Sequence, residues 1–173
     1  FDRSKHMASV ILNMAGYVRA PSTADKKEVD INERIDGAIE IAILASYSND
    51  IHLDKNFSSL PPILAKPEEI QQVFLNLLTN AVQAMEGKGK LTISTQSENG
   101  NVMVKISDTG PGIPQKYLSK IYDPFFTTKE QGKGTGLGLN IVHQLVVKYE
   151  GHIDVSSSLE KGTTFTIMFP AHH

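Results

Sequence analysis

Apolar residues recur along most of the chain with the spacings that are typical of helices and strands. Residues 2–19 place apolar side chains three and four positions apart, which predicts an amphipathic helix. Residues 32–45 and 67–85 carry the same helical pattern, and Pro67 suits the first turn of the longer helix. A further helix is predicted over residues 137–149, where it ends before a glycine.

Between these helices, segments that alternate or are rich in apolar residues predict strands. The expected strands are residues 28–31, 50–57, 90–97, 101–107, 152–157 and 163–169. Residues 108–138 are rich in Gly, Pro, Thr and Lys, which predicts a long mobile loop around one short helix at 115–121. The mixture predicts an α/β two-layer sandwich, with a mixed sheet covered by helices on one face and an additional N-terminal helix.

Composition narrows the class of protein only slightly. The 173 residues fit one compact domain with a short appendage, and 40% of them are hydrophobic, which is enough for a core. A formal net charge of -2 gives no basic excess for nucleic acid or an anionic membrane surface. The chain has no cysteine, which excludes disulfides and thiolate zinc sites and is compatible with the cytoplasm. No signal peptide or apolar run of about 20 residues is visible.

Two asparagines give the helix predicted at 67–85 a polar side. Asn76 and Asn80 are four residues apart, so their side chains lie one above the other, with Gln72 and Gln83 nearby. Amide carbonyls are neutral oxygen ligands of the kind that Mg²⁺ accepts beside phosphate oxygens and water. A polar stripe that faces water gives the same pattern, so these residues alone do not define a site.

Asp108 directly follows a predicted strand and is followed by Gly110 and Gly112. An ionised aspartate at a strand end accepts a hydrogen bond from an exocyclic amino group. Glycines permit a positive φ and the close approach of a flat ring. An ordinary Asp-x-Gly turn has the same sequence, and both interpretations stay open at this point.

Glycines also gather in residues 132–139 (GKGTGLGL), which open the helix predicted at 137–149. Backbone N–H groups at a helix N-terminus attract phosphate, and Lys129 and Lys133 add positive charge. The run fits neither a Walker A loop nor the dinucleotide fingerprint, whose third glycine would fall on Leu139. A flexible glycine linker is the alternative, although linkers seldom lead into an amphipathic helix.

The order and spacing of these segments resemble those of the catalytic domain of sensor histidine kinases. The resemblance covers residues 28–170, and the residues of its N box and F box are similar to those of the nitrogen-regulation-like subgroup. The segments that carry it are residues 76–81 (NLLTNA, the N box), 108–112 (DTGPG, the first glycine box), 123–129 (DPFFTTK, the F box), 134–139 (GTGLGL, the second glycine box) and 162–165 (GTTF, the terminal glycine motif).

This resemblance implies a Bergerat-type fold that binds ATP and Mg²⁺. It implies that Asp108 bonds the adenine amino group, that Asn80 holds Mg²⁺, and that Thr164 lies near the adenine. Residues 111–137 are expected to form a lid, with Phe125 and Phe126 as its apolar contacts, and Asn76 and Lys129 are the expected catalytic residues. The residues expected to bind the nucleotide are Asn76, Asn80, Gln83, Asp108, Gly110, Gly112, Ile113, Phe125, Thr128, Lys133, Gly134, Thr135, Gly136, Leu137, Gly138, Leu139 and Thr164.

Asn76 distinguishes this chain from the hydrolytic members of the same fold. Type II topoisomerases and heat-shock chaperones carry a glutamate there, which activates water. An amide cannot act as a general base at neutral pH, so ATP is expected to be held and its γ-phosphate passed to a nucleophile from elsewhere. The resemblance implies a histidine in a His-Glu/Asp-x-Arg/Lys-x-Pro context, which none of the six histidines has.

The resemblance also divides the chain and suggests partners. Residues 1–20 are expected to be the remnant of a second dimerisation helix, 21–27 a linker, 28–170 the catalytic domain and 171–173 a tag stub. The expected partners are the dimerisation and phosphoacceptor domain of the same protein and a response-regulator receiver domain, without nucleic acid. The full-length protein is expected to be a cytoplasmic homodimer or the cytoplasmic part of a membrane-bound sensor. The alternatives are a nucleotide-binding regulatory module without phosphotransfer and a serine kinase of the anti-sigma type.

Overall fold

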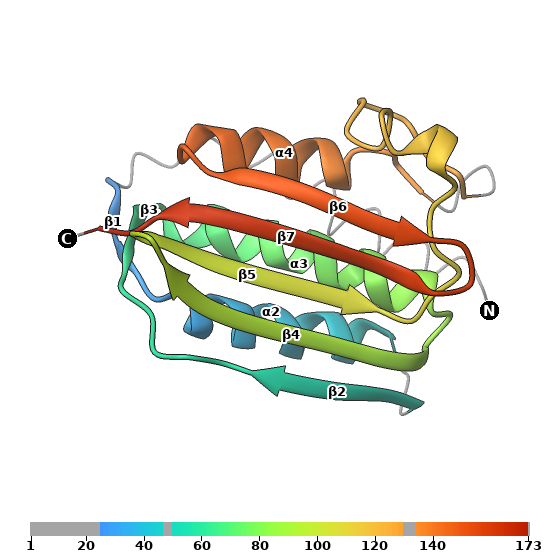
Figure 1. Ribbon diagram of the computed structural model, residues 1–173, viewed down its shortest axis with the longest axis horizontal. Helices are drawn as coiled ribbons and strands as arrows, with labels where there is room; N and C mark the ends of the chain where they lie inside the picture. The colour runs from blue at the N-terminus through green and yellow to red at the C-terminus, as the bar shows by residue number, and fades with distance from the viewer. Residues whose placement is uncertain (1–24, 47–49, 130–133, 173) are drawn as a thin grey trace.

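A mixed five-stranded sheet carries three helices on one face (Figure 1). The computed structural model describes residues 25–46, 50–129 and 134–172, so the helix predicted at 2–19, most of the predicted linker and Lys133 lie outside it. In order across the sheet, the strands are β2 (Asp50–Asn56), β4 (Lys88–Glu98), β5 (Asn101–Asp108), β7 (Gly162–Pro170) and β6 (His152–Ser158). Only β2 and β4 pair in parallel; the other pairs are antiparallel. The predicted two-layer sandwich is confirmed.

The helices are α2 (Ile31–Ser46), α3 (Pro67–Ala84) and α4 (Gly138–Lys148). α2 begins one residue earlier than predicted, because the Asp30 carboxylate accepts the backbone N–H of Glu33 at 3.2 Å and caps the helix. α3 begins at Pro67, as predicted from the missing N–H of proline. Of the described residues, no helix is both long and apolar enough to cross a membrane.

The hydrophobic core fills the space between the helices and the sheet. The predicted apolar face of α3 is buried throughout, and it comprises Ile70, Val73, Phe74, Leu77, Leu78, Ala81 and Val82. The central strands alternate, so Val102, Val104 and Ile106 of β5 face the helices and the residues between them face away. Asp108 continues this inward series, which places a carboxylate at the edge of the core.

Two short elements differ from the sequence prediction. β1 (Lys27–Val29) pairs with β3 (Ile63–Ala65) in a separate two-stranded sheet, and β3 was not predicted because three residues after two prolines show no period. The helix predicted at 115–121 is wrong in extent: only the 3₁₀ turn η1 (Gln115–Tyr117) forms. Its backbone bonds span three residues, from Tyr117 to Pro114 and from Lys120 to Tyr117, so the chain continues as successive turns.

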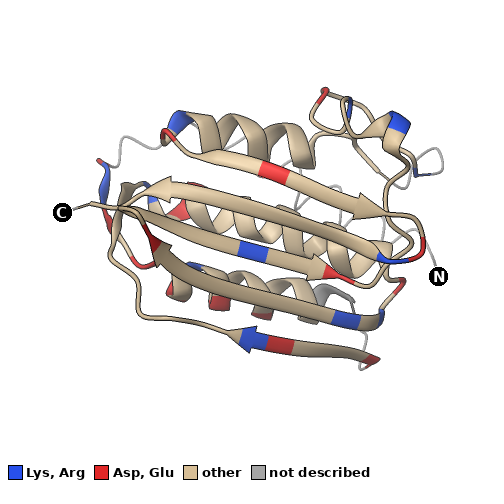
Figure 2. Ribbon diagram, viewed as in Figure 1, with Lys and Arg blue, Asp and Glu red and all other residues tan. Residues whose placement is uncertain are grey.

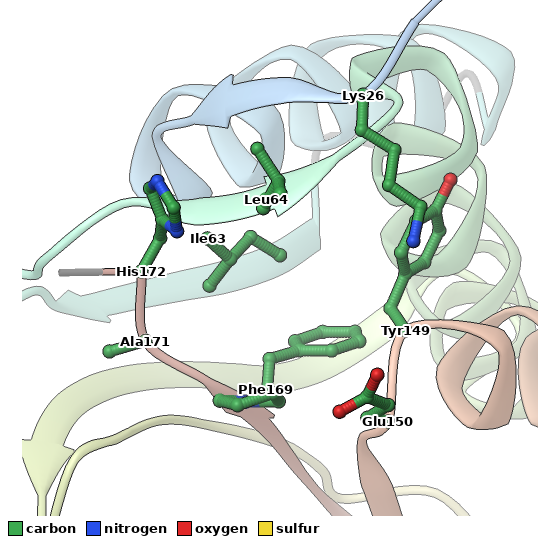
Figure 3. Close-up of a pocket in the computed structure, with 9 residues that line it drawn as sticks. Lys26, Ile63, Leu64, Tyr149, Glu150, Phe169, Ala171 and His172 are labelled. Carbon is green, nitrogen blue, oxygen red and sulfur yellow. The ribbon is translucent and has the colours of Figure 1, made fainter.

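At the end of the sheet away from Asp108, α3 and α4 are tied together. The Glu69 carboxylate accepts the Tyr149 hydroxyl at 2.5 Å and the Lys148 ammonium at 2.7 Å, and burial raises the pKa of Tyr149 to about 12. Beside Tyr149 lies a cavity of about 210 Å³ with Ile63 and Phe169 in its wall (Figure 3). Because β5 and β7 pair from Asp108 to Asn101, this cavity is separated from Asp108 by the length of the sheet.

The residues predicted to be a tag stub are partly packed onto the domain. The backbone N–H of Ala171 donates to the carbonyl of Gly100 at 2.9 Å, and that of His172 donates to the carbonyl of Pro62 at 2.7 Å. His173 lies outside the described residues.

Candidate functional site

Asp108 is a buried carboxylate at the last position of β5. Its side chain is held by the backbone N–H of Gly110, which donates to the Asp108 Oδ1 at 2.8 Å. Burial raises the pKa of Asp108, and hydrogen bonds from the backbone of Gly110 and Thr163 act in the opposite direction. Only 9% of the residue is exposed, so this carboxylate is both desolvated and fixed in orientation.

The glycines after Asp108 let two segments approach closely. A Cβ on Gly110 would lie 2.9 Å from the Asp108 Oδ1, so a larger residue would disturb that carboxylate. Gly112 has a φ of 76°, and a Cβ there would lie 2.1 Å from the backbone oxygen of Ser158. The next residue, Ile113, packs partly against the core. The first lid residues therefore rest directly on the turn between β6 and β7.

The polar side of α3 meets the first residue of α4. Asn76 is 8% exposed, and its Nδ2 donates to the carbonyl of Gly138 at 3.3 Å. A Cβ on Gly138 would lie 3.9 Å from the Nδ2 of Asn80 and 4.0 Å from the Cγ of Asn76. The structure thus brings together two predicted groups that are 62 residues apart in the chain, the α3 amides and the glycine-rich helix start.

Thr164, which was predicted to lie near the adenine, is not the register partner of Asp108. Thr164 pairs with Ser107, and their hydroxyl oxygens are 2.8 Å apart on the sheet face away from the helices. Asp108 pairs instead with Thr163, which is 6% exposed and faces the helices. A strand alternates its faces with each residue, so an assignment one position off moves the side chain across the sheet.

The predicted lid, residues 111–137, contains η1 and ends where α4 begins. Phe126 packs against the core, with its ring centroid 5.6 Å from that of Tyr117, whereas Phe125 is 73% exposed. The backbone N–H of Phe125 donates to the carbonyl of Gly136 at 2.9 Å, which closes the loop on itself. The apolar role predicted for this pair therefore fits Phe126 but not Phe125 in this structure.

Lys129 links the lid to α3. The residue is exposed, and its Nζ donates to the Oε1 of Gln83 at 2.5 Å. Desolvation lowers the pKa of Lys129. The neighbouring Thr128, also a predicted site residue, is exposed. Lys129 and Gln83 were predicted as site residues, and the structure brings them together.

The remaining predicted residues form the end of the lid. Gly136 has a φ of 66°, and Leu137 precedes the first residue of α4. The Oγ1 of Thr135 accepts the backbone N–H of Leu137 at 3.4 Å. Leu139 packs partly against the core, while a Cβ on Gly134 would lie 2.8 Å from the Oγ1 of Thr127. These residues lead the lid onto the polar side of α3.

Three hydroxyl groups at the site were not predicted. The Oγ1 of Thr109 accepts the backbone N–H of Lys90 at 2.9 Å and fixes the Asp108 turn to β4. On the other side, the Oγ of Ser157 accepts the N–H of Ile113 at 2.7 Å and lies 2.8 Å from the Oγ1 of Thr163. Serine and threonine are common in strands and turns, so only the strand register could have identified these residues.

Charge is distributed without a strong local excess. Lysines, arginines and acidic residues are scattered over the helices and strands (Figure 2). Within residues 25–46, 50–129 and 134–172, no group of three or more His, Cys, Asp or Glu is placed to hold a metal ion. The polar side chains of the candidate site are instead the amides of Asn76 and Asn80 and the Asp108 carboxylate.

The family model that matches this chain describes histidine kinase-, DNA gyrase B- and HSP90-like ATPases, and the match covers residues 65–173. The chain is 34% identical over 172 residues to the sensor histidine kinase ZraS of Escherichia coli K12. That alignment covers 99% of this chain and 36% of ZraS, so the chain spans about a third of that relative's length.

Solved structures of histidine kinases also match this chain. The catalytic domain of the histidine kinase ThkA matches with a TM-score of 0.73 and 31% identity, covering 86% of this chain and 97% of that domain. Full-length ShkA, solved in complex with AMPPNP, matches with a TM-score of 0.76 and 26% identity, covering 99% of this chain and 37% of ShkA.

Proposed function

Because this chain belongs to the family of histidine kinase-, DNA gyrase B- and HSP90-like ATPases, and is the ATP-binding catalytic domain of a sensor histidine kinase, we propose that it transfers the γ-phosphate of ATP to a histidine on another domain. The observation that carries this proposal is the meeting of Asn76 with the first residue of α4, at the end of a glycine-rich lid. Asp108, which ends β5, lies near the C-terminal end of α3, since a Cβ on Gly110 would lie 3.3 Å from the Cβ of Ala84.

The proposed pose places the adenine at Asp108 and the phosphates at the start of α4. Asp108 is a fixed acceptor for an exocyclic amino group, and its register partner Thr163, in place of Thr164, would lie near the adenine. The start of α4 has no side-chain cap among the described residues, so its first backbone N–H groups suit phosphate oxygens. ShkA was solved in complex with AMPPNP, which supports the binding of a nucleotide by this fold.

Mg²⁺ fits the side-chain donors of the candidate site. The Asn80 side chain is half-buried beside Gly138, in a space that a Cβ on that glycine would enter. An amide oxygen is a hard neutral ligand of the kind that Mg²⁺ accepts together with phosphate oxygens and water. When bound, the ion would neutralise phosphate charge. In this proposal Asn80 holds the ion, and Asn76 and Lys129 position the phosphates.

The residues of α3 favour transfer to another group over hydrolysis. A water molecule needs a general base, and an amide at position 76 cannot accept its proton at neutral pH. The carboxylates of α3 are Glu68 and Glu69, which lie in its first turn, at the other end of the helix from Asn80. Catalysis would therefore rest on positioning the γ-phosphate for a nucleophile that another domain delivers.

We extend the proposal to the full-length protein, because the sensor histidine kinase ZraS is about three times as long as the part that this chain matches. Residues 28–170 are the catalytic domain, and the segment before it leads to a dimerisation domain that carries the acceptor histidine. The phosphoryl group would then pass to an aspartate of a response-regulator receiver domain. We place this reaction in the cytoplasm of a homodimeric sensor. The assignment to the nitrogen-regulation-like subgroup stays a prediction.

A phosphotransfer experiment tests the function. This chain is incubated with Mg²⁺ and ATP labelled at the γ-phosphate, together with the separately produced dimerisation domain of the same protein. We expect label on the dimerisation domain, in an acid-labile and base-stable form that indicates phosphohistidine, and no label on this chain alone. Asn80→Asp is expected to alter the dependence of labelling on Mg²⁺ concentration.

The control is the same dimerisation domain with its histidine replaced by glutamine, which should stay unlabelled. Tight ATP binding with no transfer to the unaltered domain would contradict the kinase proposal and favour a nucleotide-binding regulatory module. Label that is stable to acid would instead indicate a serine kinase.

A further inference from the structure

Ser157 in β6 is the centre of a hydrogen-bond cluster that joins the lid to β7. Its Oγ lies 2.7 Å from the backbone N of Ile113, 3.0 Å from the carbonyl oxygen of Gly162 and 2.8 Å from the Oγ1 of Thr163. A serine hydroxyl has one proton to donate and two lone pairs with which to accept. Three partners therefore use its full capacity.

The chemistry of these partners fixes the direction of each bond. The Ile113 N–H can only donate to Ser157, and the Gly162 carbonyl can only accept the Ser157 proton. The second lone pair of Ser157 is left for Thr163, so the Thr163 hydroxyl donates its proton to Ser157. Thr163 then has only lone pairs to present to any other group.

This orientation matters because Thr163 is the register partner of Asp108. Both residues face the helices, and side chains that are directly opposite in an antiparallel pair lie close together. The Asp108 carboxylate accepts only, and the oriented Thr163 hydroxyl also accepts only. Two adjacent acceptors favour a purine with an amino group at position 6 and disfavour one with a carbonyl there.

From this geometry we infer that Ser157 is a positioning residue that sets the preference for adenine over guanine, by orienting the Thr163 hydroxyl and anchoring the first residues of the lid at Ile113. The inference rests on the proposed function, because it assumes that the purine lies at Asp108. Ser157 acts through its neighbours and does not itself touch the nucleotide.

The lid anchor gives Ser157 a second route to the same site. The backbone N–H of Glu160 donates to the carbonyl of Pro111 at 2.8 Å, next to the close contact between Gly112 and Ser158. Together with the bond from Ile113 to Ser157, these contacts hold residues 111–113 on the β6–β7 turn. Loss of the Ser157 hydroxyl would remove the side-chain part of this anchor.

The test compares Ser157→Ala with Ser156→Ala in the chain as it stands. Ser156 precedes Ser157 in the same strand but is exposed, on the opposite side of the strand. Calorimetry gives the Kd for ATP and for GTP in the presence of Mg²⁺. One hydrogen bond is worth about 0.5–1.5 kcal/mol, so Ser157→Ala should weaken ATP binding about two- to tenfold. GTP binding should weaken less or tighten, while Ser156→Ala should change neither Kd.

A second pair of variants separates positioning from stability. Ser157→Thr keeps the hydroxyl and should restore the ratio of the ATP and GTP affinities, whatever its effect on Tm. Thr163→Val removes the oriented hydroxyl itself. It should therefore bring the ATP and GTP affinities closer together, even if Ser157→Ala does not fold.

The outcomes are distinguishable. An unchanged ratio in a folded Ser157→Ala or in Thr163→Val, with ATP still bound by the unaltered chain, would overturn the role of Ser157 alone. A chain that does not bind ATP would overturn the proposed function, and the inference with it.

Discussion

The candidate site has two halves that are built differently. In the fixed half, Asn76, Asp108 and Thr163 are 8%, 9% and 6% exposed, and the core lies directly behind them. In the lid, Phe125 is 73% exposed, and the loop is held by a backbone bond to Gly136 and by the bond from Lys129 to Gln83. The fixed half presents groups whose positions are set by folding, so it suits recognition of the base. The lid exposes Phe125 and is attached to α3 by an exposed hydrogen bond from Lys129, so it suits closure over the phosphates.

Leu78→Ala should have the largest effect, because it removes the packing beneath the fixed half. Leu78 is fully buried in α3, and such a change costs about 2–5 kcal/mol of unfolding free energy. Urea unfolding followed by circular dichroism measures this loss. Thr128→Ala in the lid is the control, and it should stay within about 0.5 kcal/mol of the unaltered chain. Equal losses in the two variants would contradict the division into a fixed half and a lid.

Asp108→Asn should weaken ATP binding while leaving the fold intact. The side-chain oxygen of asparagine can still accept the Gly110 N–H, but the negative charge that faces the purine amino group is lost. A hydrogen bond to a charged group is worth about 1.5–3 kcal/mol, which corresponds to a Kd about 10 to 150 times higher. Calorimetry with ATP and GTP checks this. The same proportional loss for both nucleotides would show that Asp108 does not read the base.

Within the lid, Phe126→Ala and Phe125→Ala should differ although the residues are neighbours. Phe126 packs against the core and Tyr117, so its truncation should cost about 1–3 kcal/mol, less than for a fully buried phenylalanine. Phe125 is exposed, so its truncation should change stability by less than about 0.5 kcal/mol. Thermal unfolding compares the two. A larger loss for Phe125→Ala would mean that its ring is buried in solution.

The smallest expected effect is a pH dependence that belongs to Asp108. Because burial raises its pKa above the ordinary value of 3.8, the folded state binds the proton more tightly than the unfolded state. The contribution of Asp108 to stability is therefore greatest below pH 3.8 and falls as the pH rises through the raised pKa. As the pH rises from 3.8 through the raised pKa, the Tm of the unaltered chain should fall relative to the Tm of Asp108→Asn. Parallel Tm curves for the two proteins between pH 4 and 7 would contradict a desolvated carboxylate.

Much of the fixed half could be predicted from the sequence. The apolar spacing of α3 predicted both its buried face and the side on which Asn76 and Asn80 lie, because helical periodicity relates position directly to direction. Asp108 was predicted as a site residue from its place after a strand, and the structure puts it at the end of β5. The meeting of Asn76 with Gly138 was implied only by the family resemblance, since no local pattern relates residues 62 positions apart.

The rest depended on information that a single sequence lacks. The choice between Thr163 and Thr164 turns on strand register, and two adjacent threonines give no period that would decide it. Ser157 stands in a run of three serines, and only the neighbouring strand and the lid distinguish it from the other two. In the lid, successive three-residue turns form in place of the predicted helix. Helix propensity alone does not specify how a segment packs when it has no regular apolar face.

The bonds from Glu69 to Tyr149 and Lys148 have a mechanical consequence for the opposite end of α4. They provide a fulcrum where the two helices cannot separate without breaking these hydrogen bonds. α4 has 11 residues, so it is a lever about 16 Å long from that fulcrum to Gly138. A tilt of about 5° would move Gly138 by roughly 1.4 Å at that length, enough to break its 3.3 Å bond to Asn76. Such a tilt would separate the start of α4 from Asn76 while the other end of the helix stays attached to Glu69.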